Sequence, residues 1–589
     1  MKVKSSVPEV IYHGVSASPG LAHGPAFIFF QKEMEVPVYG VSREEFEKEV
    51  KRFEEALQRT KEAIVNLKTK VANTLGEYEE RIFDAHLLVL EDKALIDGTI
   101  KELSETGYNI DYCFHSVSKR YIKGFEEIDD EYIRDRALDI RDVSKRVLRD
   151  LLGENQVGLL NFNEQKVVIT EELTPSDTVG IKKDCILAIV TEKGGSTSHS
   201  VIMARALQIP AVVGLRNITD HLTNDSYVIV DGYDGLVIAN PTEETLARYV
   251  EIKRERRDVQ KIFESVNHLS AMTKDELHFP LMVNMENIED IRRAREVGAH
   301  GVGLFRTEAL YLKRNSIPTE DEQFESYKRI VEGMAPHSVT IRTLDLGGDK
   351  KFNGLLLSGE EVNPLMGVRA IRLCLDQIEE FKKQLRAIMR ASAFGKVRIL
   401  YPMITNTQEL VLANETLEEV KEELRKRGIQ FDQNVEVGSM IETPSAALTI
   451  DLLAPHCGFL SIGTNDLIQY LLAVDRVNHR ISHLYQPHHP AVIRILEMII
   501  RAGHGKGMEI SVCGEMAGDP VYAALLLGMG VDSLSIIPSL LPEVKYFIRH
   551  MKLEDAKTMA KQVIQETEAS RILKILREFY FERVGEVWK

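Results

Sequence analysis

The amino-acid sequence predicts a multidomain α/β protein: a split α/β domain with an inserted helical bundle, a linker helix, and a (β/α)₈ barrel. Three observations carry this prediction. The chain has 589 residues, enough for three or four domains. Strand signals stand on both sides of a long helical block in the first half. The second half then alternates strand and helix signals up to the end of the chain.

The first α/β domain is predicted from residues 1–40 and 154–241. Residues 10–29 indicate two short strands around a Ser-Pro-Gly turn. From Ser42, which forms a capping-box pattern with Glu45, the sequence stays charged, helical and nearly free of proline. This stretch predicts a helical bundle over residues 41–153, inserted into the domain. Further strands are expected at 166–170, 186–190, 211–213, 227–231 and 236–238.

The second half predicts a barrel over residues 271–589. A charged helix over 242–266 comes first, and we expect residues 242–270 to link the two halves. Helical stretches such as 288–297 and 491–502 separate the strand candidates, and repeated βα units in one domain indicate a (β/α)₈ barrel. The eight expected strands are 281–285, 301–305, 340–346, 397–401, 435–441, 459–462, 509–512 and 533–537.

Composition limits the classes of partner. Lys and Arg number 74 against 90 Asp and Glu, a net charge of −16. This charge argues against nucleic acid or an anionic membrane surface and suits a small basic protein. The five cysteines include no CxxC pair, which favours a reducing cytoplasm. No apolar run approaches membrane-spanning length and no signal peptide is evident, so direct membrane insertion is not expected.

A glycine turn precedes a candidate reactive histidine, His199. Gly194 and Gly195 follow the predicted strand 186–190 and permit a tight turn. Residues 196–198 are Ser, Thr and Ser, which can cap the helix that follows. His199 would therefore lie at a helix N-terminus, where backbone N–H groups and the helix dipole favour a phosphate. The alternative is a hydrogen-bonded core histidine, but the strand–turn–helix context favours a phosphorylation site.

Polar side chains follow most of the predicted barrel strands, where the catalytic groups of such barrels lie. Glu442 and Asp466 follow successive strands, and two carboxylates with no nearby His or Cys suit a hard cation such as Mg²⁺. Other polar groups at the same end fit an anionic substrate: arginine forks match phosphate and carboxylate, and an amide donates to a phosphoryl oxygen. These groups are Arg306, Arg342, Asn465 and Arg476. Any one arginine alone is more often part of a surface salt bridge; the series points to a site.

Six segments resemble, in order, the motifs of enzyme I of the bacterial phosphoenolpyruvate (PEP):sugar phosphotransferase system: 193–205, 301–308, 342–350, 363–372, 461–467 and 512–518. The similarity runs from about residue 11 to about residue 538. By this resemblance, His199 accepts phosphate from PEP, Thr178 orients its imidazole, and Cys513 handles the proton at the methyl carbon of pyruvate. The resemblance also implies that Glu442 and Asp466 hold Mg²⁺. The PEP-binding residues it implies are Arg306, Arg342, Asn465, Asp466 and Arg476.

The resemblance also implies partners. Phospho-His199 would pass its phosphoryl group to a histidine of the carrier protein HPr, after a large domain movement about the linker helix. HPr would dock on the helical insert, with residues 84–92 as a candidate contact segment; the alternative is an ordinary bundle helix. A homodimer through the barrel is expected. One departure is Ser196, where enzyme I proteins commonly carry arginine; this affects partner details and transfer rate more than the chemistry.

Three alternatives remain beside enzyme I. Pyruvate phosphate dikinase and PEP synthase also use ATP, but no glycine-rich ATP loop or nucleotide domain is evident. The nitrogen-branch paralogue usually has an extra N-terminal sensor domain, and only about ten residues precede the first strand here. A regulator that binds PEP or HPr without turnover belongs to another class. The presence of His199, Glu442, Asp466 and Cys513 together argues against that regulator.

Overall fold

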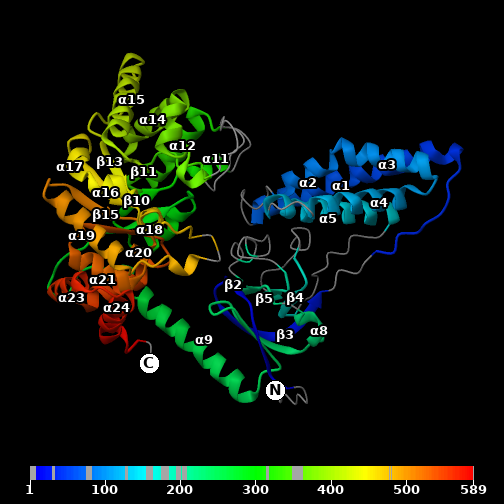
Figure 1. Cartoon of the computed structure of the whole chain (residues 1–589), viewed down its shortest axis with the longest axis horizontal. Helices are drawn as coiled ribbons and strands as arrows, with labels where there is room; N and C mark the ends of the chain where they lie inside the picture. The colour runs from blue at the N-terminus through cyan, green and yellow to red at the C-terminus, as the bar shows by residue number, and fades with distance from the viewer. Residues whose placement is uncertain are drawn as a thin grey trace. The chain divides into compact units, whose positions relative to one another are not determined.

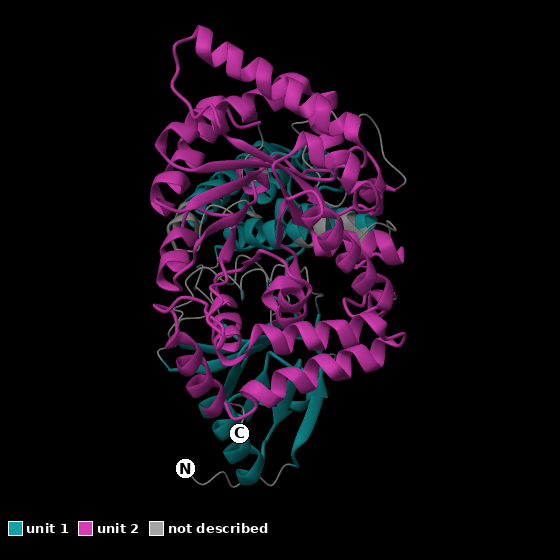
Figure 2. Cartoon of the chain, turned by 90° about the vertical axis from the view of Figure 1, so that its left-hand side faces the viewer, with its two compact units in different colours: residues 1–254 teal, residues 255–589 magenta. Residues whose placement is uncertain are grey.

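The computed structural model divides the chain into two compact units, residues 1–254 and 255–589, coloured separately in Figure 2. The structure describes residues 8–29, 34–74, 82–126, 131–153, 164–173, 185–193, 201, 204, 209–215, 217–312, 317–347, 363–476, 478 and 481–587.

The first unit contains an eight-stranded sheet in the order β1-β8-β7-β3-β4-β5-β6-β2. Strands β3 to β6 are parallel to their neighbours in that run, and the remaining pairs are antiparallel. The strands are β1 (Val10–His13), β2 (Val15–Ser18), β3 (Leu21–Phe29), β4 (Lys166–Thr170), β5 (Ile186–Thr191), β6 (Ala211–Val213), β7 (Tyr227–Asp231) and β8 (Leu236–Ala239). The strands expected after the helical block are confirmed, with small changes at their ends.

The expectation of two strands in residues 10–29 was wrong, because this stretch forms three. Gly14 separates β1, which pairs with β8, from β2, which pairs with β6 at the other end of the sheet order. A Cβ at Gly14 would lie 2.6 Å from the Val213 carbonyl oxygen, so only glycine lets the chain pass so close to β6. The sequence pattern contains no signal for this change of partner.

Five helices lie between β3 and β4 in the sequence and pack on one another (Figure 1). They are α1 (Phe46–Thr74), α2 (Ile82–Leu90), α3 (Lys93–Thr106), α4 (Ile110–Glu126) and α5 (Glu131–Leu152). In α1, Phe53, Ala56 and Ile64 are buried at helical spacing and share a core with Phe114 and Val147. The inserted helical block is therefore confirmed, while its boundaries at residues 41 and 153 stay a prediction.

Helix α9 (Glu243–Glu264) matches the helix predicted over residues 242–266 and runs across the boundary between the two units. Its buried residues are Val259 and Phe263, both near its C-terminal end. A helix with so little buried surface contributes little to either core. Among the described helices, none combines the length and the apolar character that a membrane span requires.

The second unit is a closed barrel of eight parallel strands (Figure 1). Helices on its outside include α10 (Asp290–Glu296), α15 (Thr407–Lys426), α19 (Pro490–His504) and α24 (Ala569–Val584). All eight predicted strands are found, so the barrel prediction is confirmed. The strands are β9 (Leu281–Met285), β10 (Gly301–Phe305), β11 (Ser338–Arg342), β12 (Val397–Tyr401), β13 (Glu436–Ile441), β14 (Phe459–Ile462), β15 (Glu509–Val512) and β16 (Ser533–Ile536).

Strand β11 corrects the prediction of a strand over 340–346, because it ends at Arg342. Thr343 N–H still donates to the Leu400 carbonyl of β12 at 3.0 Å. Side chains take the next two donors: Leu344 N–H donates to Gln384 Oε1 at 3.0 Å, and Asp345 N–H to Glu308 Oε1 at 3.2 Å. With these donors engaged, the ladder with β12 does not continue. Arg342 is therefore the last residue of its strand, at the end of the barrel where functional groups gather.

Gly303 in β10 marks a close approach inside the barrel. A Cβ there would lie 2.5 Å from Ser535 Oγ and 3.0 Å from Met282 Cβ. We expect Gly303→Ala to destabilise the protein by about 1–3 kcal/mol, because overpacking forces neighbours to shift. Thermal unfolding measures this as a lower Tm. In the control Gly458→Ala the nearest atom is 3.8 Å away, and equal Tm values for the two variants would contradict the prediction.

Candidate active site

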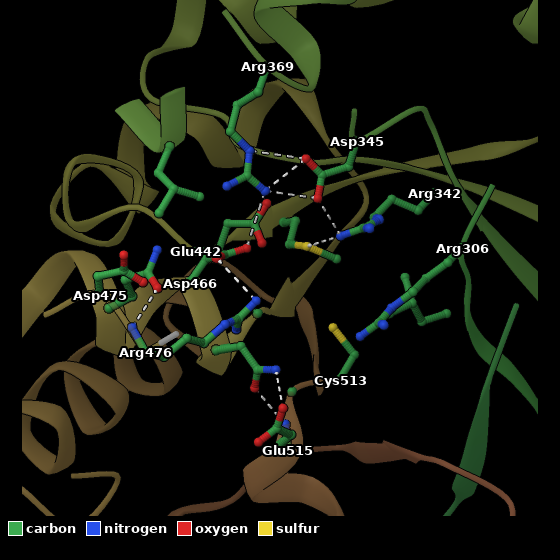
Figure 3. Close-up of a pocket in the computed structure, with 17 residues that line it drawn as sticks. Arg306, Arg342, Asp345, Arg369, Glu442, Asp466, Asp475, Arg476, Cys513 and Glu515 are labelled. Atoms are coloured by element: carbon green, nitrogen blue, oxygen red, sulfur yellow. Dashed lines mark hydrogen bonds and ion pairs between the residues drawn. The ribbon is translucent and has the colours of Figure 1, made fainter. Parts of the chain in front are cut away.

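A cavity of about 240 Å³ opens at the carboxyl ends of the barrel strands (Figure 3). It contains every residue that the sequence pointed to in this half of the chain. These residues are Arg306, Arg342, Glu442, Asn465, Asp466, Arg476 and Cys513. They are up to about 200 positions apart in sequence, and the closed barrel brings them together because parallel strands present their ends on one rim.

Arg342 is buried and held by two carboxylates. Its Nη2 lies 2.6 Å from Glu308 Oε1, and its Nη1 lies 3.1 Å from Asp345 Oδ2. Burial opposes the charged form, but the carboxylates of Glu308 and Asp345 outweigh it, and the pKa of Arg342 is raised. Its Nε is buried without a hydrogen-bond partner among the described residues. Arg342 therefore stays cationic and retains a donor for a ligand.

Arg369 is a buried cavity residue that sequence reasoning missed. Its Nη2 lies 2.9 Å from Asp345 Oδ1 and 3.6 Å from Asp466 Oδ2. Figure 3 shows Arg342 and Arg369 reaching Asp345 from two sides. The residue stands in the segment 363–372, which resembles a motif of the family's PEP-binding barrel, but it follows no strand. A position at a strand end therefore does not predict its place in the cavity.

Glu442 and Asp466 supply the carboxylates. Glu442 follows β13, and its Oε1 accepts a hydrogen bond from Met403 N–H at 2.6 Å. Asp466 lies in the first turn of α18 (Thr464–Leu472), with Arg476 Nη2 3.9 Å from its Oδ1. Burial, and then the charges of Asp466 and Asp345, raise the pKa of Glu442. A cation beside this pair would favour the ionised form.

The donor set fits a hard cation. Among the residues that the structure describes, no group of three or more His, Cys, Asp and Glu side chains is placed to hold a metal. Mg²⁺ is commonly held by one or two carboxylates, with water and substrate oxygens completing its octahedron. The Glu442–Asp466 pair matches that pattern. Gly463 keeps this corner open, because a Cβ there would lie 2.7 Å from Glu442 Oε2.

The other polar groups lie at the cavity rim. Arg306 follows β10, its side chain is 35% exposed, and its Nη1 lies 2.6 Å from Glu286 Oε1. Asn465 Nδ2 donates to Glu515 Oε1 at 2.9 Å. Within the described part of the chain, Arg306 Nε and Arg476 Nη1 are buried without hydrogen-bond partners. The cavity therefore presents arginine donors to an anion.

Cys513 follows β15 and closes one side of the cavity. It is 3% exposed, its thiol accepts a hydrogen bond from Ser461 Oγ at 3.3 Å, and burial raises its pKa. Asn284 Nδ2 donates to the Cys513 carbonyl at 3.0 Å, and Asn284 Oδ1 accepts from Ser535 Oγ at 2.7 Å. The thiol is therefore protonated at neutral pH, and its backbone is held by a hydrogen-bond chain that ends beside Gly303.

The predicted site residues of the first unit, His199, Thr178, Gly194 and Gly195, lie outside the described residues, as does Ser196. The strand predicted before Gly194, Gly195 and His199 is confirmed as β5. Within the segment 84–92, His86 is fully buried, with Nε2 3.3 Å from Asp139 Oδ1 and Nδ1 3.7 Å from Asp142 Oδ2. Leu88 of the same helix is 64% exposed, so this segment offers an apolar side chain to the surface.

Comparison with known proteins identifies the family. Residues 13–136, 162–235 and 260–553 match the N-terminal, mobile and PEP-binding domains of PEP-utilising enzymes. The phosphoenolpyruvate-protein phosphotransferase of Priestia megaterium is 40% identical over 567 residues, covering 96% of this chain and 98% of that protein. The chain belongs to the phosphoenolpyruvate-protein phosphotransferase family. The resemblance read from the motifs is thereby confirmed, together with the transferase class.

Other family members agree. The phosphoenolpyruvate-protein phosphotransferase of Bacillus subtilis (strain 168) is 39% identical over 567 residues, covering 96% of this chain and 99% of that protein. A solved structure, the NMR solution structure of Enzyme I, has 39% sequence identity to this chain. The match covers 42% of this chain and 99% of that chain, with a TM-score of 0.36. Sequence identity over nearly the whole chain, not superposition, carries the assignment to the family.

Proposed function

We propose that this protein transfers the phosphoryl group of PEP to His199 and then to a histidine of HPr, releasing pyruvate with the help of Mg²⁺. One observation carries the proposal. This chain belongs to the family by sequence identity, and one cavity of its barrel is lined by arginines, a carboxylate pair and a protonated thiol. PEP needs each of these: cationic groups for its phosphate and carboxylate, oxygen ligands for a metal, and an acid for the carbon that becomes a methyl group.

The proposed binding roles follow from charge. Arg306, Arg342 and Arg476 bind the anionic groups of PEP, and Asn465 donates to a phosphoryl oxygen. Asp466 and Glu442 would hold the metal, and Asp466 also lines the cavity proposed for the substrate. When bound, Mg²⁺ would neutralise charge on the phosphoryl oxygens. To these we add Arg369, whose guanidinium fixes Asp345 and Asp466 and so positions the carboxylates around the substrate.

The proposed chemistry has two halves. A neutral nitrogen of His199 attacks phosphorus in line, the bond from phosphorus to the enol oxygen breaks, and the electron pair stays on the enolate of pyruvate. Thr178 orients the imidazole, and the turn at Gly194 and Gly195 places it at a helix N-terminus. The Cys513 thiol then gives its proton to the terminal carbon, forming the methyl group of pyruvate.

The remaining expectations are also proposals. HPr docks on the helical insert, where the exposed Leu88 supports the segment 84–92 as part of the contact surface. The domains are those predicted from the sequence: 1–40 with 154–241, then 41–153, 242–270 and 271–589. Residues 242–270 act as the hinge between the histidine domain and the barrel. We further propose a homodimer through the barrel and a cytoplasmic location.

The test is pyruvate release from PEP by the full-length protein with Mg²⁺, with and without HPr. We expect about one pyruvate per chain without HPr, because the phosphohistidine has no acceptor, and sustained release with HPr. Release that requires AMP and pyrophosphate, or AMP and phosphate, would instead indicate a dikinase or PEP synthase. No release under any condition would leave a regulator that binds PEP or HPr without turnover.

Arg306 allows binding to be separated from stability. Arg306→Met removes a charged donor worth about 1.5–3 kcal/mol, so we expect the KM for PEP to rise roughly 10- to 100-fold. Because the side chain is 35% exposed, Tm should change little. Arg293→Met is the control, since that side chain is 42% exposed and pairs with Glu296 on α10. A KM for Arg306→Met equal to that of the control would remove Arg306 from the binding site.

A further inference from the structure

A second cavity of about 960 Å³ adjoins the first and shares residues with it. Both cavities are lined by Arg306, Cys513, Gly514 and Glu515, so these residues form a common wall. The second cavity otherwise differs in character. Its lining is largely apolar and includes Val521, Ile536, Ile537, Leu540 and Phe581.

The apolar lining is unusually open to solvent. Ile537 is 49% exposed, Leu540 38% and Phe581 54%, although they come from separate parts of the unit: the end of β16, the turn before α22 (Leu541–His550), and α24. Single exposed apolar residues are common, but a group of them around one concavity beside a polar site is typical of a ligand pocket. A bound apolar group would remove this surface from water.

The two acidic residues that line only the second cavity are engaged within the protein. Asp519 Oδ1 accepts from Val521 N–H at 2.8 Å, and Glu543 Oε1 accepts from Tyr580 O–H at 2.8 Å. Burial raises the pKa of both carboxyl groups. Among the described residues that line this cavity, Arg306 is the one cation, and it lies on the shared wall. Glu515 lies on the same wall, and its Oε1 already accepts from Asn465 Nδ2 at 2.9 Å. An anionic head group is therefore favoured beside Arg306 and disfavoured deeper in.

We propose that the second cavity binds the aliphatic tail of a monocarboxylic 2-oxo acid whose carboxylate pairs with the arginines of the first cavity. This inference rests on the proposed function, in which Cys513 faces the methyl carbon of pyruvate. Because Cys513 lines both cavities, a chain extended from that carbon leads past the thiol into the apolar space. In a longer 2-oxo acid, the carboxylate and oxo group therefore occupy the pyruvate site in the first cavity, and the aliphatic tail occupies the second. Such acids compete with PEP.

The test measures the Kd values of pyruvate, 2-oxobutanoate, 2-oxopentanoate and 2-oxohexanoate for the full-length protein with Mg²⁺, by calorimetry and by competition with PEP. We expect Kd to fall roughly fourfold for each added methylene that is buried. A Kd that does not depend on chain length would overturn the inference. So would tight binding of the longer acids that leaves PEP binding unaffected, since that would place them elsewhere.

Two leucines give matched variants. Leu540 lines the second cavity and is 38% exposed, whereas Leu412 on α15 lies outside it and is 41% exposed. Leu540→Ala is expected to weaken 2-oxohexanoate by about threefold or more relative to pyruvate in the same variant, and Leu412→Ala to leave that ratio unchanged. Equal ratios in the two variants would overturn the assignment of the tail to this cavity.

Because the test measures binding and not turnover, failure of this inference can be distinguished from failure of the proposed function. A protein that releases pyruvate from PEP but shows no gain with chain length would retain the function and lose the second site. A protein without PEP turnover that still binds longer acids more tightly, with the Leu540 dependence, would retain the pocket and lose the reaction.

Discussion

Glu442→Gln is expected to lower the rate of pyruvate release by about 10²–10⁴-fold while leaving the fold intact. Glutamine keeps the shape of the side chain, and its Oε1 can still accept the 2.6 Å hydrogen bond from Met403 N–H. It lacks the negative charge that a divalent cation needs. The loss should therefore appear in turnover and in the Mg²⁺ concentration required, measured by steady-state kinetics at several metal concentrations.

The same variant is expected to be more stable than the wild type at neutral pH without metal. In the folded protein the pKa of Glu442 is raised, by burial first and then by Asp466 and Asp345, so the ionised form is disfavoured relative to the unfolded chain. That unfavourable contribution is absent below the unfolded pKa and grows as pH rises through the folded pKa. Glutamine mimics the neutral form of the carboxyl group. The Tm of Glu442→Gln should therefore exceed that of the wild type by about 2–4 °C for each kcal/mol of unfavourable free energy that is removed, and this difference should vanish in acid.

Magnesium should reverse the order of stability. A ligand that binds only the folded state raises its stability, so Mg²⁺ should increase the Tm of the wild type and have little effect on Glu442→Gln. Glu436→Gln is the matched control, because Glu436 begins the same strand at the opposite end of the barrel. A variant that kept wild-type turnover, or that gained the wild-type Tm increase with Mg²⁺, would show that Glu442 is not a metal ligand.

The barrel was predictable because each strand is a short apolar segment between turn signals, and eight of them followed one another with helices between. Strand ends identified the cavity for the same reason: the topology alone places Arg306, Glu442 and Cys513 on one rim. The boundary of β11 was wrong because Gln384 and Glu308, distant in the sequence, take the backbone donors of Leu344 and Asp345. Competition of this kind is tertiary and leaves no local pattern.

The cavity residues that were not assigned a role from the sequence are those that position other charged side chains. Arg369 and Asp345 pair with the charged groups found at strand ends. Arg369 stands in a loop, and Asp345, which lies at an expected strand end, was given no role from the sequence. Their roles depend on which charged groups meet after folding. The same holds for the three strands in residues 10–29, where Gly14 redirects the chain to a different edge of the sheet.

Cys513→Ala is expected to slow pyruvate formation by about 10²–10⁴-fold while the KM for PEP stays close to that of the wild type. Alanine removes the acid but none of the groups proposed to bind the phosphate and carboxylate. Cys374→Ala is the control, because Cys374 is a barrel cysteine of similar burial (5% exposed, against 3% for Cys513) that does not line the cavity. The enolate released by the Cys513 variant should take its proton from water without facial selectivity, which stereospecifically deuterated PEP analogues would detect.

The pH dependence of pyruvate release tests the role of Cys513 as proton donor independently. Burial raises the pKa of the Cys513 thiol, so the acid form that donates the proton persists above the ordinary thiol range of about 8.5. Pyruvate release should therefore stay on its plateau through pH 8.5 and decline only above it, and Cys513→Ala should lack that alkaline limb. Turnover in Cys513→Ala equal to that in Cys374→Ala, or an alkaline limb that survives the substitution, would assign the proton donor to another group. The neighbour that donates to the sulfur, Ser461 at 3.3 Å, would then be the next residue to replace.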